Sequence, residues 1–212
     1  GGWLVPFLMA CFIIALSVIA ERLMTISTAS GKGSTANFVR KIRSYLNDNN
    51  LSSAISECDK QKGSIANILK QGLERYQVLA GNQKLEPEEK LQEVQTAIEE
   101  AMMLEVPLLE KNLVVLSTIA SVSVLIGLFG TVVGMIRAFQ ALATAGTPNA
   151  AELSSGISEA LINTAGGLFG AIVGTISYNY FVTKVGNITY MINEATYNML
   201  QILAFRSRKA QA

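Results

Sequence analysis

Glu159 is the side chain whose position most demands a chemical explanation, because it lies inside an apolar stretch, residues 152–181. A carboxylate within a membrane is costly unless it is paired, hydrated or protonated, and such groups often belong to ion or proton pathways. Arg137, in a second apolar stretch over residues 112–143, is a candidate ion-pair partner. A structural ion pair and a proton-handling carboxylate are therefore two open interpretations of Glu159.

Two threonines lie deep within the same stretches. Thr131 lies 17 residues before Pro148, and Thr164 lies 16 residues after it. If the chain folds back near Pro148, both hydroxyls lie roughly 25 Å of helix below the turn, at 1.5 Å per residue. One threonine in a membrane helix usually donates to its own backbone. Two at one depth, repeated around an oligomer, can instead form a polar ring that lines a pore, and both interpretations stay open.

The spacing along the third stretch separates its polar groups by direction. Thr164 follows Glu159 by five residues, which is about 140° around a helix. If Thr164 faces a pore, Glu159 therefore faces a neighbouring helix or subunit.

Small residues recur at helical spacing in the second and third stretches. Glycines four apart let two helix backbones approach closely in lipid, where packing rather than hydrophobicity drives association. We assign a packing role to six of them: Gly127, Gly130, Gly134, Gly166, Gly170 and Gly174.

The distribution of charge indicates a membrane protein. The chain has 212 residues, of which 50% are hydrophobic and only 16% charged, against about 25% charged in soluble domains. Three stretches are long and apolar enough to cross the bilayer as helices, namely 1–21, 112–143 and 152–181. We expect an all-α protein with three transmembrane helices, the second and third extended into a cytoplasmic helical bundle.

Lysine and arginine set the expected orientation. They are frequent in the insert over residues 22–111 and in the amphipathic C-terminal helix over residues 182–212, but absent from the short turn over residues 144–151. The positive-inside rule then places the insert and the C-terminus in the cytoplasm, and the N-terminus and the turn in the periplasm. The chain begins at Gly1 with neither Met nor a basic leader, so we expect the first span to lack N-terminal residues.

The insert shows helix boundaries and no strand pattern. Asn49 or Asn50 can cap one helix, Ser64 can begin another, and Pro87 suits the first turn of a long third helix. We expect Pro107 to kink this helix while its apolar pattern continues into the second span.

Several classes of function find no support in the sequence. There is no His, and Cys11 and Cys58 lie far apart, which predicts neither a metal site nor a disulfide. We find no nucleophile–base set and no phosphate loop, and therefore expect no catalytic residue, no enzyme and no cofactor. The net charge of +1 is uninformative, and nothing in the sequence suggests a nucleic-acid patch. A solute transporter is disfavoured by the lack of an inverted repeat or paired broken helices.

Two motifs resemble the ExbB/TolQ/MotA proton-channel family, and within it the three-span ExbB and TolQ branch. Residues 127–134 read GLFGTVVG, similar to the family's second-span signature, and residues 156–168 read GISEALINTAGGL, similar to its third-span signature. The three-span plan with a large first cytoplasmic loop is also similar. Val124 stands where the family often has Pro, and Arg137 is outside the signature.

The resemblance implies a subunit of a proton-driven motor in the bacterial inner membrane. It implies a homopentamer around an ExbD- or TolR-like single-span partner whose membrane Asp carries the proton, driving a TonB- or TolA-like protein. It places Thr131 and Thr164 on the proton pathway and identifies Glu159 with the family's membrane acidic residue. The alternative is a non-conducting membrane scaffold, in which Glu159 and Arg137 only fix helix register.

Overall fold

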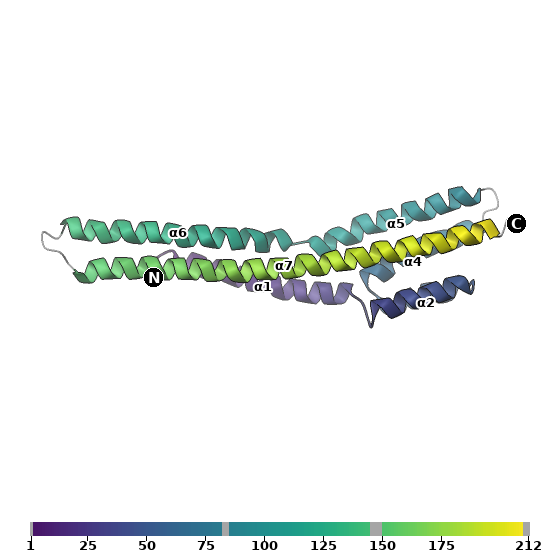
Figure 1. Ribbon diagram of the computed structural model, residues 1–212, viewed down its shortest axis with the longest axis horizontal. Helices are drawn as coiled ribbons and strands as arrows, with labels where there is room; N and C mark the ends of the chain where they lie inside the picture. Colours follow the sequence, from purple (N-terminus) through teal and green to yellow (C-terminus); the bar gives the residue numbers. More distant parts are fainter. Residues whose placement is uncertain (1, 82–84, 145–149, 210–212) are drawn as a thin grey trace. The chain divides into compact units, whose positions relative to one another are not determined.

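The computed structural model describes residues 2–81, 85–144 and 150–209, so residues 145–149 of the expected turn at 144–151 lie outside the described residues. These described residues form helices and no strand. The helices are α1 (Val5–Ala29), α2 (Thr35–Asn47), α3 (Leu51–Gln61), α4 (Ser64–Ala80), α5 (Pro87–Glu110), α6 (Leu113–Thr144) and α7 (Ala150–Lys209) (Figure 1). Three segments are long and apolar enough to cross a membrane: α1, the α5–α6 segment and α7. The predicted all-α class with three spans is confirmed.

The chain divides into two compact units. The membrane unit comprises Gly1–Arg22 and Asn112–Val182, and the insert unit comprises Leu23–Lys111 and Thr183–Ala212. Helix α7 continues without interruption from the third span into the C-terminal segment and so contributes residues to both units.

The membrane unit consists of α1, α6 and the first part of α7. Helix α1 meets α7 through Phe12 and Phe169, whose ring centroids are 5.7 Å apart. Large apolar side chains such as Phe129, Leu161 and Ile176 remain exposed on this unit. Exposed apolar surface on this scale is typical of contact with lipid or with other helices.

A buried charge lies within α1, at the last residue that this helix contributes to the membrane unit. Arg22 is 1% exposed, and its Nη2 lies 2.5 Å from Glu21 Oε1. Asn112 Nδ2 donates to Glu21 Oε2 at 2.8 Å, which ties the start of the α6 segment to this pair. The sequence analysis counted this position only as the first residue of the charged insert, 22–111, and the burial of Arg22 depends on tertiary contacts.

The expectation for Pro107 was wrong in one respect, because the helix breaks rather than merely bends. Pro107 does lie within α5, but α5 ends at Glu110 and α6 begins at Leu113. Asn112 between them has φ +62°, a left-handed conformation that Asn adopts more readily than most residues and that ends a helix.

The insert unit has a continuous apolar core built from α2 to α5 and the end of α7. The large fully buried side chains come from α2, α4, α5 and α7, while α3 contributes the small Ala54 and Cys58. The large ones include Leu46, Ile68, Leu73, Val94, Ile192 and Leu203.

The predicted helix starts in this unit are confirmed. Asn50, one of the two candidate caps, accepts from the Ser53 backbone N–H at 3.0 Å. Helix α4 begins at Ser64, and Pro87 occupies the first turn of α5.

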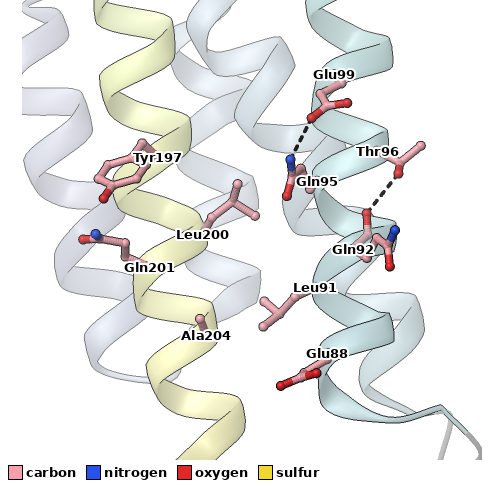
Figure 2. Close-up of a pocket in the computed structure, with 10 residues that line it drawn as sticks. All are labelled: Glu88, Leu91, Gln92, Gln95, Thr96, Glu99, Tyr197, Leu200, Gln201 and Ala204. Atoms are coloured by element: carbon pink, nitrogen blue, oxygen red, sulfur yellow. Dashed lines mark hydrogen bonds between the residues drawn. The ribbon is translucent and has the colours of Figure 1, made fainter.

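A surface groove runs between α5 and α7 in the insert unit (Figure 2). Leu91 and Leu200 give it an apolar floor, and its polar lining is tied to single helices, as in the 2.8 Å bond from Gln95 Nε2 to Glu99 Oε1. This groove brings together no set of groups suited to catalysis.

Ion pairs join the helices of the insert unit at its surface. Lys41 Nζ of α2 lies 2.6 Å from Glu57 Oε1 of α3, and Lys60 lies 3.5 Å from the same carboxylate. The hydrogen bond from Lys41 lowers the pKa of Glu57 below its ordinary value of 4.5, and Lys60 acts in the same direction.

Glu57→Gln is expected to reduce the pH dependence of stability on the acid side. A carboxylate with a lowered pKa stabilises the fold above its unfolded pKa, and this contribution is lost as the pH falls below about 4.5. Thermal midpoints of the full chain in detergent, followed by circular dichroism between neutral and acid pH, measure this. On acidification, the thermal midpoint of the wild type should fall further than that of Glu57→Gln. The control variant Glu100→Gln, at an exposed position of α5, should behave as wild type. Equal acid losses in all three would contradict the assignment.

Candidate functional site

The second and third spans pack with their backbones almost in contact. A Cβ built at Gly127 would lie 3.1 Å from the Gly167 Cα, and one built at Gly134 would lie 2.9 Å from the Gly156 carbonyl oxygen. A real Cβ at such distances from a backbone requires the helices to separate. Glycine at these positions is therefore what allows α6 and α7 to approach so closely.

The same contacts fix the antiparallel register of the two helices. Gly130 packs against Asn163, because a Cβ built at Gly130 would lie 2.5 Å from the Asn163 Cβ. Thr131 follows Gly130 and Thr164 follows Asn163, so the two threonines lie at nearly the same depth along the hairpin.

The two threonine hydroxyls have different hydrogen-bond partners. Thr164 Oγ1 of α7 donates across the helix contact to the Gly127 carbonyl of α6 at 3.3 Å. Thr131 Oγ1 donates to the Leu128 carbonyl of its own helix at 2.6 Å. Both side chains are half-buried in the single chain. Each hydroxyl oxygen retains lone pairs that can accept a further hydrogen bond.

Arg137 and Glu159 also meet across the hairpin. Arg137 Nη1 lies 3.3 Å from Glu159 Oε1, with the Arg137 side chain 47% exposed and that of Glu159 21% exposed. The segment before α1 covers the carboxylate from another direction, because a Cβ built at Gly2 would overlap it. Glu159 thus lies between a cation of α6 and the backbone before α1.

Helical geometry divides these polar groups between two sides of the hairpin. The residues of α7 that contact α6 form one ridge: Gly156, Ala160, Asn163 and Gly167. Glu159 and Thr164 flank this ridge in opposite directions, each about 70° from its centre at 100° per residue. On α6 the facing ridge consists of Gly127, Gly130 and Gly134. Arg137 and Thr131 flank it in opposite directions, about 50° to 70° from its centre. Because the helices are antiparallel, Thr131 and Thr164 share one side, the threonine side, and Arg137 and Glu159 share the other, the charged side.

The structure gives the predicted packing glycines different neighbours. Gly127, Gly130 and Gly134 of α6 contact α7, while Gly170 and Gly174 of α7 contact Ser123 and Ala120 of α6. Gly166 instead borders α1, where a Cβ built at Gly166 would lie 3.5 Å from the Leu8 Cδ1.

Two further glycines at the contact were missed from the sequence. Gly156 and Gly167 lie on the α7 ridge, and a Cβ built at Gly167 would lie 2.5 Å from the Ser123 carbonyl oxygen. The available signal was spacing, because Gly156 lies four residues before Ala160 and Gly167 lies four residues after Asn163. The choice between Gly166 and Gly167 depends on how α7 is rotated about its axis.

Asn163 is the functional candidate that the sequence analysis did not single out. Its side chain is 1% exposed, and its Oδ1 has no hydrogen-bond partner among the described residues. An amide directly before Thr164 in an apolar span was the available signal.

Within the described ranges, no group of three or more His, Cys, Asp or Glu side chains is placed to hold a metal ion. The hairpin contact brings together hydroxyls, an amide and the carboxylate of Glu159, which can bind water and pass protons.

Comparison with known proteins bears on this hairpin directly. The model of the MotA/TolQ/ExbB proton channel family matches residues 60–194, which include α4 to α6 and most of α7. The chain belongs to the MotA/TolQ/ExbB proton channel family. The matched range contains Thr131, Arg137, Glu159 and Thr164.

The curated relatives include proteins named TolQ and proteins named ExbB. The chain is 35% identical over 137 residues to the Tol-Pal system protein TolQ of Pseudomonas aeruginosa, covering 61% of the chain and 59% of that protein. It is 43% identical over 102 residues to TolQ of Haemophilus influenzae, covering 48% and 45%. It is 38% identical over 93 residues to the biopolymer transport protein ExbB of Salmonella typhimurium, covering 44% and 37%. The aligned part is thus under two thirds of each relative's length.

In this family member, Gly167→Ala is expected to destabilise the hairpin by about 1–3 kcal/mol, because the new methyl group meets the rigid Ser123 carbonyl. Gly166→Ala is the matched control, since its Cβ would make only an ordinary 3.5 Å contact. Unfolding of the full chain in mixed micelles measures both variants. Equal losses at the two adjacent positions would show that the α6–α7 crossing lies elsewhere.

Proposed function

We propose that the chain is a subunit of a proton-driven motor complex in the bacterial inner membrane, and that the threonine side of its hairpin borders the proton path. The observation that carries the proposal is the placement of Thr131 and Thr164 on one side of the tightly packed α6–α7 pair, at nearly one depth. Family membership supports the same reading.

The surface next to Thr131 suits a partner helix. Thr131 borders a shallow apolar hollow on α6 with Val132, Met135, Ile136 and Phe139. Such a surface can pack against an apolar helix while the threonine supplies a polar point within it.

The chain needs a proton carrier from elsewhere. Its only aspartates are Asp48 and Asp59, both in the insert, and Glu159 lies on the charged side beside Arg137. Hydroxyls and water can relay a proton but do not hold it as a titrating group does. A single-span partner with a membrane Asp, similar to ExbD or TolR, supplies that group at the threonine side.

The remaining features of the complex follow from the sequence and the relatives. The exposed apolar faces of the membrane unit support assembly into a homo-oligomer, which we take to be a pentamer. The positive charges support a periplasmic N-terminus and a cytoplasmic insert. The names of the relatives, a Tol-Pal system protein and a biopolymer transport protein, support work on a TonB- or TolA-like protein.

Removing the threonine hydroxyls tests conduction. In vesicles holding the chain and its single-span partner, Thr164→Val and Thr131→Val should each lower proton flux by roughly tenfold, about the effect of one lost hydrogen bond. Thr118→Val is the matched control, because Thr118 is also in α6 and its hydroxyl donates to its own helix at Val114, 2.8 Å away. Flux measured with a pH-sensitive dye, at unchanged assembly, reports the result. Wild-type flux in both variants would refute the pathway.

The Arg137–Glu159 pair favours one alternative, a non-conducting scaffold in which this pair sets helix register. Charge removal at both residues separates the two functions. Either single change, Arg137→Gln or Glu159→Gln, leaves one charge unpaired in the membrane and should weaken assembly, while the double variant should recover it.

Proton flux in the double variant then decides the role of Glu159. If Glu159 handles protons, assembly recovers but flux stays low. If the pair is structural only, flux recovers together with assembly. Size-exclusion chromatography and vesicle flux give the two readouts.

A further inference from the structure

Asn163 is a buried polar group that the helix contact does not satisfy. It lies on the α7 ridge facing α6, 1% exposed, with its side chain over the space that Gly130 leaves by lacking a Cβ. A Cβ built at Gly130 would lie 2.5 Å from the Cβ of Asn163, and 2.9 Å from both its Cγ and its Nδ2. Glycine at position 130 therefore makes room for an amide rather than only for a close helix crossing.

The amide oxygen needs a donor. Asn163 Oδ1 has no hydrogen-bond partner among the described residues, and a buried acceptor in an apolar surrounding is strongly unfavourable unless it is paired. A side chain from another subunit cannot reach an atom enclosed between α6 and α7 without separating the helices. A water molecule is the smallest group that can donate to it, and buried waters characteristically satisfy such groups.

Polar groups for such a water surround this point of the contact. Thr164 follows Asn163 directly, and its hydroxyl is bonded to the Gly127 carbonyl at 3.3 Å. Gly127 also borders Asn163, because a Cβ built at Gly127 would lie 3.1 Å from the backbone carbonyl oxygen of Asn163. Both the hydroxyl and the Gly127 carbonyl retain lone pairs that can accept a hydrogen bond from a water next to Asn163.

Asn163 also lies between the two sides of the hairpin. Glu159 precedes it by one helical turn on the charged side, and Thr164 is its neighbour on the threonine side. We propose that the Asn163 carboxamide holds an internal water within the α6–α7 contact, and that this water hydrates the Thr164 hydroxyl and assists proton passage there. The part about proton passage rests on the proposed function; the water site does not.

The water site is tested by solid-state NMR on the full chain, both alone and with its single-span partner, in vesicles of phosphatidylethanolamine and phosphatidylglycerol. Asparagine labelled with ¹⁵N and ¹³C is used, and the Asn163 signal is identified by its loss in Asn163→Leu. We expect magnetisation transfer from water to the Asn163 carboxamide. Transfer only from protons of another protein chain, or no transfer from water, would overturn the site.

The role in proton passage is tested by flux in the same vesicles. Asn163→Leu should lower flux by roughly tenfold, whereas Asn163→Ser, which is smaller and can still bind water, should keep most of it. Ile162→Leu, on the exposed face of α7, is the control. Wild-type flux in Asn163→Leu, or equal loss in Asn163→Ser at intact assembly, would overturn this role. If the wild type itself shows no flux, the proposed function fails, while the NMR result still decides the water site.

Discussion

The close approach of α6 and α7 is the constraint on which the membrane unit depends. In lipid there is little hydrophobic gain from bringing two apolar helices together, so their contact relies on packing and on polar groups. Glycines at 127, 134 and 167 bring the backbones within the reach of short side chains. Only at this separation can a threonine on one helix bond to a carbonyl of the other, as Thr164 does to Gly127.

The same approach sorts the polar groups of the hairpin. Small residues fill most of the centre of the contact, so the larger polar residues other than Asn163 lie on its flanks. Arg137 and Glu159 satisfy one another on the charged side, while Thr131 and Thr164 remain on the side next to an apolar surface. A costly charge is thereby neutralised away from the threonines, and the threonine side stays free of fixed charge within the hairpin.

The sequence predicted the position of the helices along the chain better than the rotation of each helix about its own axis. Apolar runs define the spans, and local signals such as Asn50 and Pro87 mark helix starts, because these effects act within one turn. The break at Asn112 was missed because a single left-handed residue leaves no periodic trace. The burial of Arg22 and the preference for Gly167 over Gly166 depend on how helices rotate against each other, which is a tertiary property.

Water access to position 164 tests the central claim most directly. Thr164→Cys, with Cys11 and Cys58 replaced by serine, is treated in membranes with a charged, water-soluble methanethiosulfonate while in complex with the single-span partner. A hydrated path beside the threonine side predicts that Thr164→Cys is modified in the intact complex. Modification only after the protein is unfolded in dodecyl sulfate would place this position in a dry contact or in lipid, and would contradict the account.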